Sequence, residues 1–182
     1  MSSKEQIFSK ALLLLGELPI NSFTEGTTGV VASNRYAEIR DAMLTDTRWR
    51  FATGKQSLNR LTATPLNEWR YAFQIPDDVL LVIRMYPSQG YEIYEDKIYT
   101  NAASVEIDYI FRPLEPAFPA YFVEALAARL AEEIAISVTN NVTLRGEMVE
   151  LAARRRAEAM HKDAQGRPNV AIQSRPFIDV RR

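Results

Sequence analysis

The chain has 182 residues, of which 47% are hydrophobic and 25% are charged, and its formal net charge is −1. This balance argues against a general electrostatic attraction to DNA or to acidic membranes. The chain has no cysteine, which excludes disulfides and thiolate metal sites, and its length fits one folding unit stabilised by packing.

Neither a membrane span nor an export signal is predicted. The longest apolar runs cover 11–15 and 79–83, far short of the roughly 18 residues that a transmembrane helix needs. Gly16 and Glu17 follow the first run directly, where a signal peptide would have a small-residue cleavage site. We therefore expect that nothing in the sequence targets the chain for export.

The first predicted element is an amphipathic helix near the N-terminus. Ser3 and Gln6 have the spacing of a capping box, and the apolar residues after them follow a helical face that ends near Gly16. A loop that includes 26–29 should follow, and then a second helix over 30–45. The predicted buried stripe of this helix consists of Ala32, Tyr36, Ile39 and Met43, widened by Ala37 and Leu44.

From residue 49 the hydrophobic period changes to that of a strand. Trp49 and Phe51 alternate with Arg48, Arg50 and Ala52, and segments that favour β-structure continue to residue 111. Candidate strands cover 71–75, 79–85, 91–94, 98–100 and 105–111. Residues 95–97, between two aromatic-rich strands, have the composition of a hairpin turn.

Large apolar side chains are concentrated on these short strands. Tyr91, Ile93, Tyr94, Tyr99 and Tyr109 can form a core or cross-strand pairs, which is the interpretation that we favour. The alternative is an exposed aromatic surface that binds a partner.

A proline-spaced corner joins the last strand to a long alanine-rich helix. The strand alternates, with apolar side chains on one face and Glu106 and Asp108 on the other. Prolines at 113, 116 and 119 then end the strand and prepare a helix start. Helices should cover 120–138 and 143–164, antiparallel because the loop between them is short. Their alanines allow close approach of helix axes, and we expect some of these faces to contact neighbouring subunits.

Residues 167–182 have no helical period and contain two prolines, which predicts an extended C-terminal arm. The arm is nevertheless rich in apolar residues, so we expect it to become ordered on a partner by strand addition.

Together these elements predict an α+β fold. An antiparallel bundle of about four helices, formed by 1–48 and 112–166, should carry a small inserted β domain, 49–111, and the extended arm, 167–182. The candidate structural core comprises Leu12, Leu15, Tyr36, Ile39, Trp49, Phe51, Leu126 and Leu151. The candidate interface residues are Phe122, Arg129, Arg154, Arg155, Arg156, Val170, Ile172, Phe177, Ile178 and Val180.

The residue types that most active sites use are scarce. The single histidine, His161, lies near a predicted helix C-terminus, where an imidazole interacts favourably with the helix dipole. With one histidine and no cysteine, the chain lacks the residues for a zinc site or for the usual catalytic triads. The acid pairs at 77–78 and 132–133 are adjacent in sequence, so their side chains point apart, unlike a glycosidase pair. The segment 26–29 lacks the lysine of a P-loop. We expect no catalysis, cofactor or metal.

The sharpest basic cluster is Arg154 to Arg156. Helical geometry spreads these side chains over about 200 degrees, which argues against a compact nucleic-acid patch. We expect a solvated face with Glu147, Glu150 and Glu158 as ionic partners, and a contact with DNA or an acidic neighbour is the alternative.

Five segments in order carry a resemblance to a known family. They are LLLLGELPI at 12–20, TRWRFA at 47–52, YAFQIPDDVLLV at 71–82, FRPLEPAFPAYFVEALAARLA at 111–131 and LRGEMVELAARRRAEAMHKDAQGRP at 144–168. In this order the chain resembles the tail tubular protein A family of short-tailed bacteriophages, the adaptor or gatekeeper proteins between portal and tail nozzle. The resemblance covers roughly residues 5–168.

The resemblance implies a structural protein of the virion with no reaction and no cofactor. It implies a twelve-fold ring of identical subunits under the portal vertex, with the portal protein, the nozzle protein and passing double-stranded DNA as partners. It would place LLLLGELPI, Trp49 and Phe51 in the core and the last two helices in the ring. Two alternatives are a tail-associated glycan hydrolase and a nucleic-acid-binding module that uses Arg154 to Arg156 with the arm residues Arg167, Arg175, Arg181 and Arg182.

Overall fold

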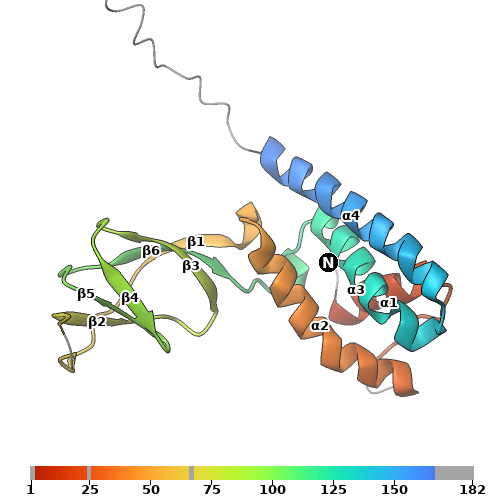
Figure 1. Ribbon diagram of the computed structural model, residues 1–182, viewed down its shortest axis with the longest axis horizontal. Helices are drawn as coiled ribbons and strands as arrows, with labels where there is room; N and C mark the ends of the chain where they lie inside the picture. Colours follow the sequence, from red (N-terminus) through yellow and green to blue (C-terminus); the bar gives the residue numbers. More distant parts are fainter. Residues whose placement is uncertain (1–2, 24–25, 66–67, 167–182) are drawn as a thin grey trace, which may run out of the picture.

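The computed structural model describes residues 3–23, 26–65 and 68–166, and the predicted arm lies outside them. In the described residues the fold is α+β, as predicted, with four helices and two small antiparallel sheets. The helices gather at one end of the molecule and the strands at the other (Figure 1). The helices are α1 (Lys4–Leu14), α2 (Gly26–Asp46), α3 (Ala120–Thr139) and α4 (Val142–Gln165), and two short 3₁₀ turns are η1 (Arg50–Ala52) and η2 (Glu115–Ala117).

Helix α1 begins and ends with the predicted chemistry. The Ser3 hydroxyl accepts a hydrogen bond from the Gln6 amide at 3.3 Å, and the Gln6 side chain accepts one from the Ser3 amide at 3.0 Å, so the capping box is present. After the helix, Gly16 adopts a left-handed φ of 77°, which glycine accommodates without steric cost. The Glu17 amide then donates to the Leu12 carbonyl at 3.0 Å and closes the helix end.

Helix α2 begins four residues before its predicted start, so the prediction of a loop at 26–29 was wrong. Only glycine fits at position 29 of this helix, because a Cβ there would lie 2.8 Å from the Phe23 carbonyl oxygen. This close approach explains why glycine occupies position 29 despite its poor helix propensity. Along the predicted stripe Tyr36, Ile39, Met43 and Leu44 are buried. Ala37 is exposed, which corrects its assignment to the stripe, and the side chain of Ala32 is outside the described set.

The strand predicted at Trp49 does not form. Arg50–Ala52 make a 3₁₀ turn, and the first strand is β1 (Thr53–Ser57). The sequence TGKQS carries no apolar alternation, which is why this strand was missed. The alternation of Trp49 and Phe51 instead reflects a tight turn that directs both rings toward the helices, where their centroids are 6.2 Å apart.

The two sheets have three strands each. The first has the order β1-β6-β3 and the second the order β2-β5-β4, with every neighbouring pair antiparallel. The predicted hairpin turn is confirmed between β4 and β5, where Glu95 has a left-handed φ of 56°. The remaining strands are β2 (Tyr71–Gln74), β3 (Val79–Tyr86), β4 (Tyr91–Tyr94), β5 (Lys97–Thr100) and β6 (Glu106–Phe111).

Asp108 on the central strand β6 departs from the expected solvent-facing pattern. It is 6% exposed, because β1 and β3 flank it on both sides. Lys55 on β1 places its ammonium 3.3 Å from the carboxylate, and Arg48 approaches to 4.0 Å. The central strand thus buries Asp108, while Glu106 on the same face stays exposed, and a neighbouring strand supplies an ionic partner for the buried carboxylate.

Two hydrophobic clusters are formed, and the helical one extends into the predicted β domain. One cluster joins residues of all four helices to Trp49, Ala52 and Ile110, and the other lies among the strands around Phe73, Ile98 and Ile107. The predicted boundary at residue 49 therefore falls inside the helical core. Of the candidate core residues, Leu12, Leu15, Tyr36, Ile39, Trp49 and Leu126 are buried, while Phe51 and Leu151 are partly buried and pack against the same cluster.

Phe122 belongs to this core, which corrects its assignment to an interface. It is fully buried, with its ring centroid 5.1 Å from that of Trp49, 4.8 Å from Phe51 and 5.0 Å from Phe118. Helix α3 packs against α1, α2 and α4. A helix that is covered on three sides keeps no apolar face for a neighbouring subunit at this position.

Tyr36 is a core residue whose substitution should raise the stability of the fold rather than lower it. Its side chain is 3% exposed, and its hydroxyl finds no hydrogen-bond partner among the described residues. Burial, with a smaller contribution from Glu115, raises the pKa of this hydroxyl. Because an unsatisfied buried hydroxyl is costly, we expect Tyr36→Phe to stabilise the fold by about 1 kcal/mol in urea denaturation. Tyr91→Phe, at a half-exposed tyrosine, is the matched control with no change, and a destabilised Tyr36→Phe would show that the hydroxyl is satisfied.

Candidate interaction sites

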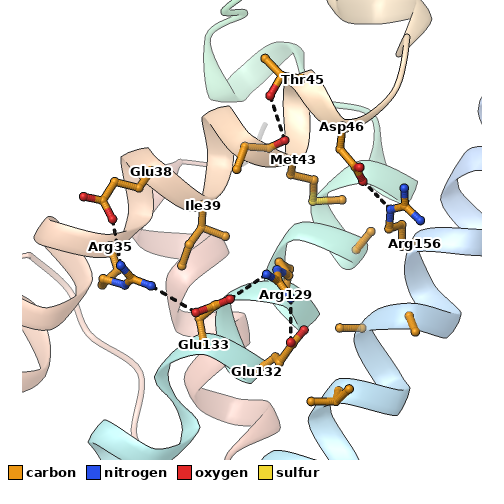
Figure 2. Close-up of a pocket in the computed structure, with 15 residues that line it drawn as sticks. Arg35, Glu38, Ile39, Met43, Thr45, Asp46, Arg129, Glu132, Glu133 and Arg156 are labelled. Carbon is orange, nitrogen blue, oxygen red and sulfur yellow. Dashed lines mark hydrogen bonds and ion pairs between the residues drawn. The ribbon is translucent and has the colours of Figure 1, made fainter.

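A groove of about 830 Å³ opens between α2 and α4, with α3 behind it (Figure 2). We call it the α2–α4 groove. Small alanines on α4 leave this space open, because they cannot reach across to α2. The apolar part of its lining comes from Ile39, Ala42 and Met43 on α2, Ala125 on α3, and Val149, Ala152 and Ala153 on α4.

The charged rim of the groove is neutralised by its own ion pairs. Arg129 binds Glu132 at 2.6 Å and Glu133 at 2.7 Å, and Arg35 binds Glu133 at 3.1 Å (Figure 2). Arg35 also pairs with Glu38, and Arg156 on α4 pairs with Asp46 on α2 across one end of the groove. Such exposed pairs contribute little to stability individually. Their effect is to leave an apolar lining with few unpaired charges, which suits an apolar protein surface.

The three consecutive arginines of α4 point to different surroundings. Arg156 reaches Asp46, Arg155 pairs with Glu158 at 3.2 Å, and Arg154 is exposed. The predicted ion pair with Glu158 is therefore confirmed, whereas Arg156 pairs with Asp46 on α2 and not with a glutamate of its own helix. The cluster forms no single basic patch, in agreement with its helical spacing.

A second apolar surface lies at the end of α1. Leu13 is 61% exposed, Leu14 40% and Leu18 85%, and we call these three residues the leucine patch. The expectation that the whole LLLLGELPI segment lies in the core was wrong, since of its five leucines Leu12 and Leu15 are buried and the other three are exposed. Helix α1 packs on α3, and no residue of α1 lines the groove. The helical part thus presents two unlike apolar surfaces, a groove and a protruding patch.

The aromatic residues of the β region divide between core and surface. Tyr109 is buried, as expected, and Tyr94 makes an edge contact with Tyr99 at 5.8 Å between centroids. Tyr91, Ile93 and Tyr94 on β4 are nevertheless exposed, so burial in a core was a wrong prediction for this strand, whereas the contact of Tyr94 with Tyr99 on β5 is one of the predicted cross-strand pairs. The alternation of the sequence could not reveal this, because it does not say which strand lies at a sheet edge.

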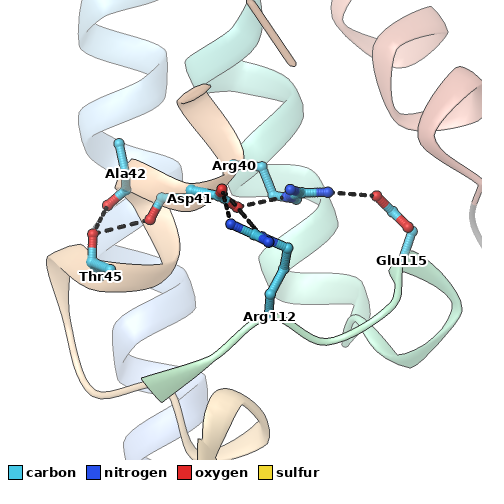
Figure 3. Close-up of polar contacts among 6 residues, drawn as sticks. All are labelled: Arg40, Asp41, Ala42, Thr45, Arg112 and Glu115. Carbon is cyan, nitrogen blue, oxygen red and sulfur yellow. Dashed lines mark hydrogen bonds and ion pairs between the residues drawn. The ribbon is translucent and has the colours of Figure 1, made fainter. Parts of the chain in front are cut away.

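An ionic network ties α2 to the proline corner between β6 and α3 (Figure 3). Arg112 donates to both carboxylate oxygens of Asp41, at 2.8 Å through its closest nitrogen, and Arg40 donates to Asp41 at 2.9 Å and to Glu115 at 3.1 Å. Burial by itself would raise the pKa of Asp41, but the hydrogen bonds from Arg112 and Arg40 outweigh it and lower that pKa. The network therefore stays charged at neutral pH and fixes the corner against α2.

The part of the chain that the structure describes holds no candidate metal centre. No group of three or more histidine, aspartate and glutamate side chains among them could hold a metal ion. Glu132 and Glu133 both form ion pairs with Arg129. His161 is exposed, and its Nε2 atom lies 2.9 Å from Nε2 of Gln165. None of the helices in the described ranges has the length and apolar character needed to cross a bilayer.

The candidate contact residues have different outcomes. Arg129 and Arg156 line the groove, and Arg155 lines a small second hollow with Tyr121 and Lys162. The candidates Val170, Ile172, Phe177, Ile178 and Val180 lie outside the described residues. Sequence reasoning missed the leucine patch, although the position of Leu18 beyond the helix end was a usable signal.

Comparison of the chain with models of known protein families gives no match. A search of curated proteins also gives no match.

Proposed function

We propose that the chain is a ring-forming structural subunit that connects the portal to the tail nozzle of a short-tailed bacteriophage. The observation that supports it most is the pair of unlike apolar surfaces on the helical part, the α2–α4 groove and the leucine patch. A head-to-tail interface repeated around a closed ring joins two different faces of the same subunit. The five sequence segments that resemble the tail tubular protein A family are the reason why we propose this ring rather than another.

In this proposal the four helices form the bundle that makes the ring, and the β region is an insertion that projects from it. The virion is its location, and double-stranded DNA passes through the channel. A net charge of −1 suits such a conduit, because a strongly basic lining would retain the phosphates.

The two alternative functions receive less support from the same geometry. A glycan hydrolase needs two carboxylates facing a cleft, whereas the acids that line the groove are held in ion pairs with arginines. A nucleic-acid-binding module needs a basic stripe, whereas Arg155 and Arg156 are engaged by Glu158 and Asp46. Measured DNA affinity that falls steeply with salt would favour the second alternative.

The mass of the protein in solution tests the proposal. Native mass spectrometry of the chain, alone and mixed with portal protein, should show a closed ring or a ring seated on the portal. We expect Val149→Glu, in the groove, to weaken assembly at least about tenfold without lowering the melting temperature. The matched control is Val142→Glu, also on α4, which is 72% exposed and outside the groove lining. A monomer at high concentration, with and without portal, would contradict the proposal.

A mixing experiment tests whether the groove and the leucine patch bind each other. Leu18→Glu should also weaken the ring, because Leu18 is 85% exposed in the patch. Each variant keeps one intact surface, so an equimolar mixture of Val149→Glu and Leu18→Glu should form a dimer through one interface but no ring. A mixture that remains monomeric would show that the two surfaces have other partners.

A further inference from the structure

Strand β4 is an uncovered sheet edge. It pairs with β5 on one side, and among the described residues no strand pairs with its other side. All four of its side chains are exposed, and three of them are Tyr91, Ile93 and Tyr94. Proteins commonly protect edge strands with charge, proline or a covering segment. An edge with three large apolar side chains and one glutamate has little such protection.

One face of β4 continues the buried face of its sheet. Ile93 lies opposite Ile98 on β5, and Tyr91 lies opposite Thr100. Both β5 residues are fully buried, whereas Ile93 is 43% exposed and Tyr91 36%. The apolar layer therefore extends to β4, where the described residues cover it incompletely. An added strand with alternate apolar side chains would complete that cover.

The other face of β4 and the adjoining turn are acidic. Glu92 accepts hydrogen bonds from the Trp69 indole and the Tyr94 hydroxyl, both at 2.9 Å. The turn adds Glu95 and Asp96, and Lys97 is the one base within this hairpin, 3.3 Å from each of them. Three acids against one base favour a basic segment as the strand that binds here.

The C-terminal sequence of the chain has the complementary pattern. In FIDVRR, residues 177–182, Ile178 and Val180 would share one face of a strand, while Phe177, Asp179 and Arg181 share the other. The apolar pair matches the uncovered face at Ile93, and the terminal arginines match the acidic turn.

We propose that residues 177–182 add to the free edge of β4 as a fourth strand of the β2-β5-β4 sheet. Helix α4 ends beside η1, because the Asp163 carboxylate near its end accepts from the Arg50 amide at 3.2 Å. The helix end that precedes the segment therefore lies close to the start of β1. From 166 to 177 an extended chain can span up to about 36 Å. Disulfide trapping decides whether the segment comes from the same chain or from a neighbouring copy.

The absence of cysteine from the sequence makes disulfide trapping a sharp test. Directly opposed residues on paired strands have the Cα spacing that a disulfide requires. With oxidised glutathione as oxidant, the full chain carrying Ile93→Cys and either Ile178→Cys or Val180→Cys should form a disulfide in high yield. The matched control places the arm cysteine at position 179 instead (Asp179→Cys), where a side chain would point to the other face of the proposed strand. Equal yields with the arm cysteine at position 178, 179 or 180 would overturn strand pairing and indicate a loose tether.

The mass of the linked product separates this proposal from the ring. A linked monomer shows that the segment docks within one chain, which requires no ring, whereas a linked dimer or larger species shows that a neighbouring copy supplies it. The trapping is repeated in the Val149→Glu background, where a linked monomer should persist even if assembly is lost. Failure of trapping with assembly intact overturns the strand docking alone.

Hydrogen exchange provides a second measurement without cysteines. In the full chain the double variant Ile178→Asp, Val180→Asp should speed amide exchange in 91–94 by at least about tenfold, because docking protects the edge amides. Exchange in β2, on the far side of β5, should be unchanged. Identical exchange of β4 in both proteins would also overturn the proposal.

Discussion

Replacement of Trp49 by alanine is expected to destabilise the chain by about 3–5 kcal/mol. Trp49 is fully buried, and its ring centroid lies 5.1 Å from that of Phe122. Its indole N–H donates to the Met43 carbonyl at 2.8 Å, near the end of α2. The substitution would remove the largest buried side chain, leave a cavity between α2 and α3, and leave that carbonyl without its donor.

Urea denaturation followed by far-ultraviolet circular dichroism measures this loss of stability directly. Trp49→Phe, which keeps a ring but lacks the N–H, should cost less than the alanine variant and keeps the test informative if Trp49→Ala does not fold. Leu114→Ala, at a leucine that is 77% exposed, is the apolar control and should change the free energy of unfolding by less than about 0.5 kcal/mol. Equal unfolding midpoints for Trp49→Ala and Leu114→Ala would remove Trp49 from the core.

Elements with strong local signals could be predicted from the sequence. The capping box of Ser3 and Gln6 joins residues three apart, so it forms without tertiary contacts. The turn between β4 and β5 and the two long helices α3 and α4 are also set by neighbouring residues, and their observed bounds lie within one residue of those predicted. Sequence patterns are most informative where the decisive interactions are local.

Elements decided by distant contacts could not be predicted. Gly29 lies in a helix at a position where the Phe23 carbonyl leaves no room for a side chain, and β1 is a strand because β6 pairs with it despite its polar sequence. Phe122 and Leu13 show the same effect for side chains. Both lie on apolar helices, but α3 is covered by three other helices, whereas the end of α1 is open. Periodicity predicts an apolar face and does not identify what covers it.

The candidate groove was predictable only in part. The alanines of α4 indicated a surface that could accept a close neighbour, and Arg129 and Arg156 were already candidates for contacts. The opposite wall comes from Ile39 and Met43 on α2, which is far from α4 in the sequence. No periodic pattern reports that α2 and α4 stand on either side of α3, so the groove required the structure.

Asp163→Ala is the second substitution with a large expected effect, about 3 kcal/mol of lost stability. Asp163 is 8% exposed, and its carboxylate accepts from the Arg50 amide at 3.2 and 3.3 Å and from the Tyr121 hydroxyl at 2.7 Å. Burial raises the pKa of Tyr121, and the hydrogen bond to Asp163 raises it further, so the hydroxyl remains a donor. Removal of the carboxylate would leave two part-buried donors without their acceptor.

The effect should depend on hydrogen bonding rather than on helix charge. Asp163→Asn keeps an acceptor oxygen and should cost about 1 kcal/mol, and His161→Ala, at an exposed position of the same helix, should cost less than about 0.5 kcal/mol. Urea denaturation gives all three values. Equal losses for Asp163→Ala and His161→Ala would show that the carboxylate does not hold α4 to η1. Because residues 167–182 follow this helix end directly, a loosened α4 should also lower the yield of the disulfide between residues 93 and 178.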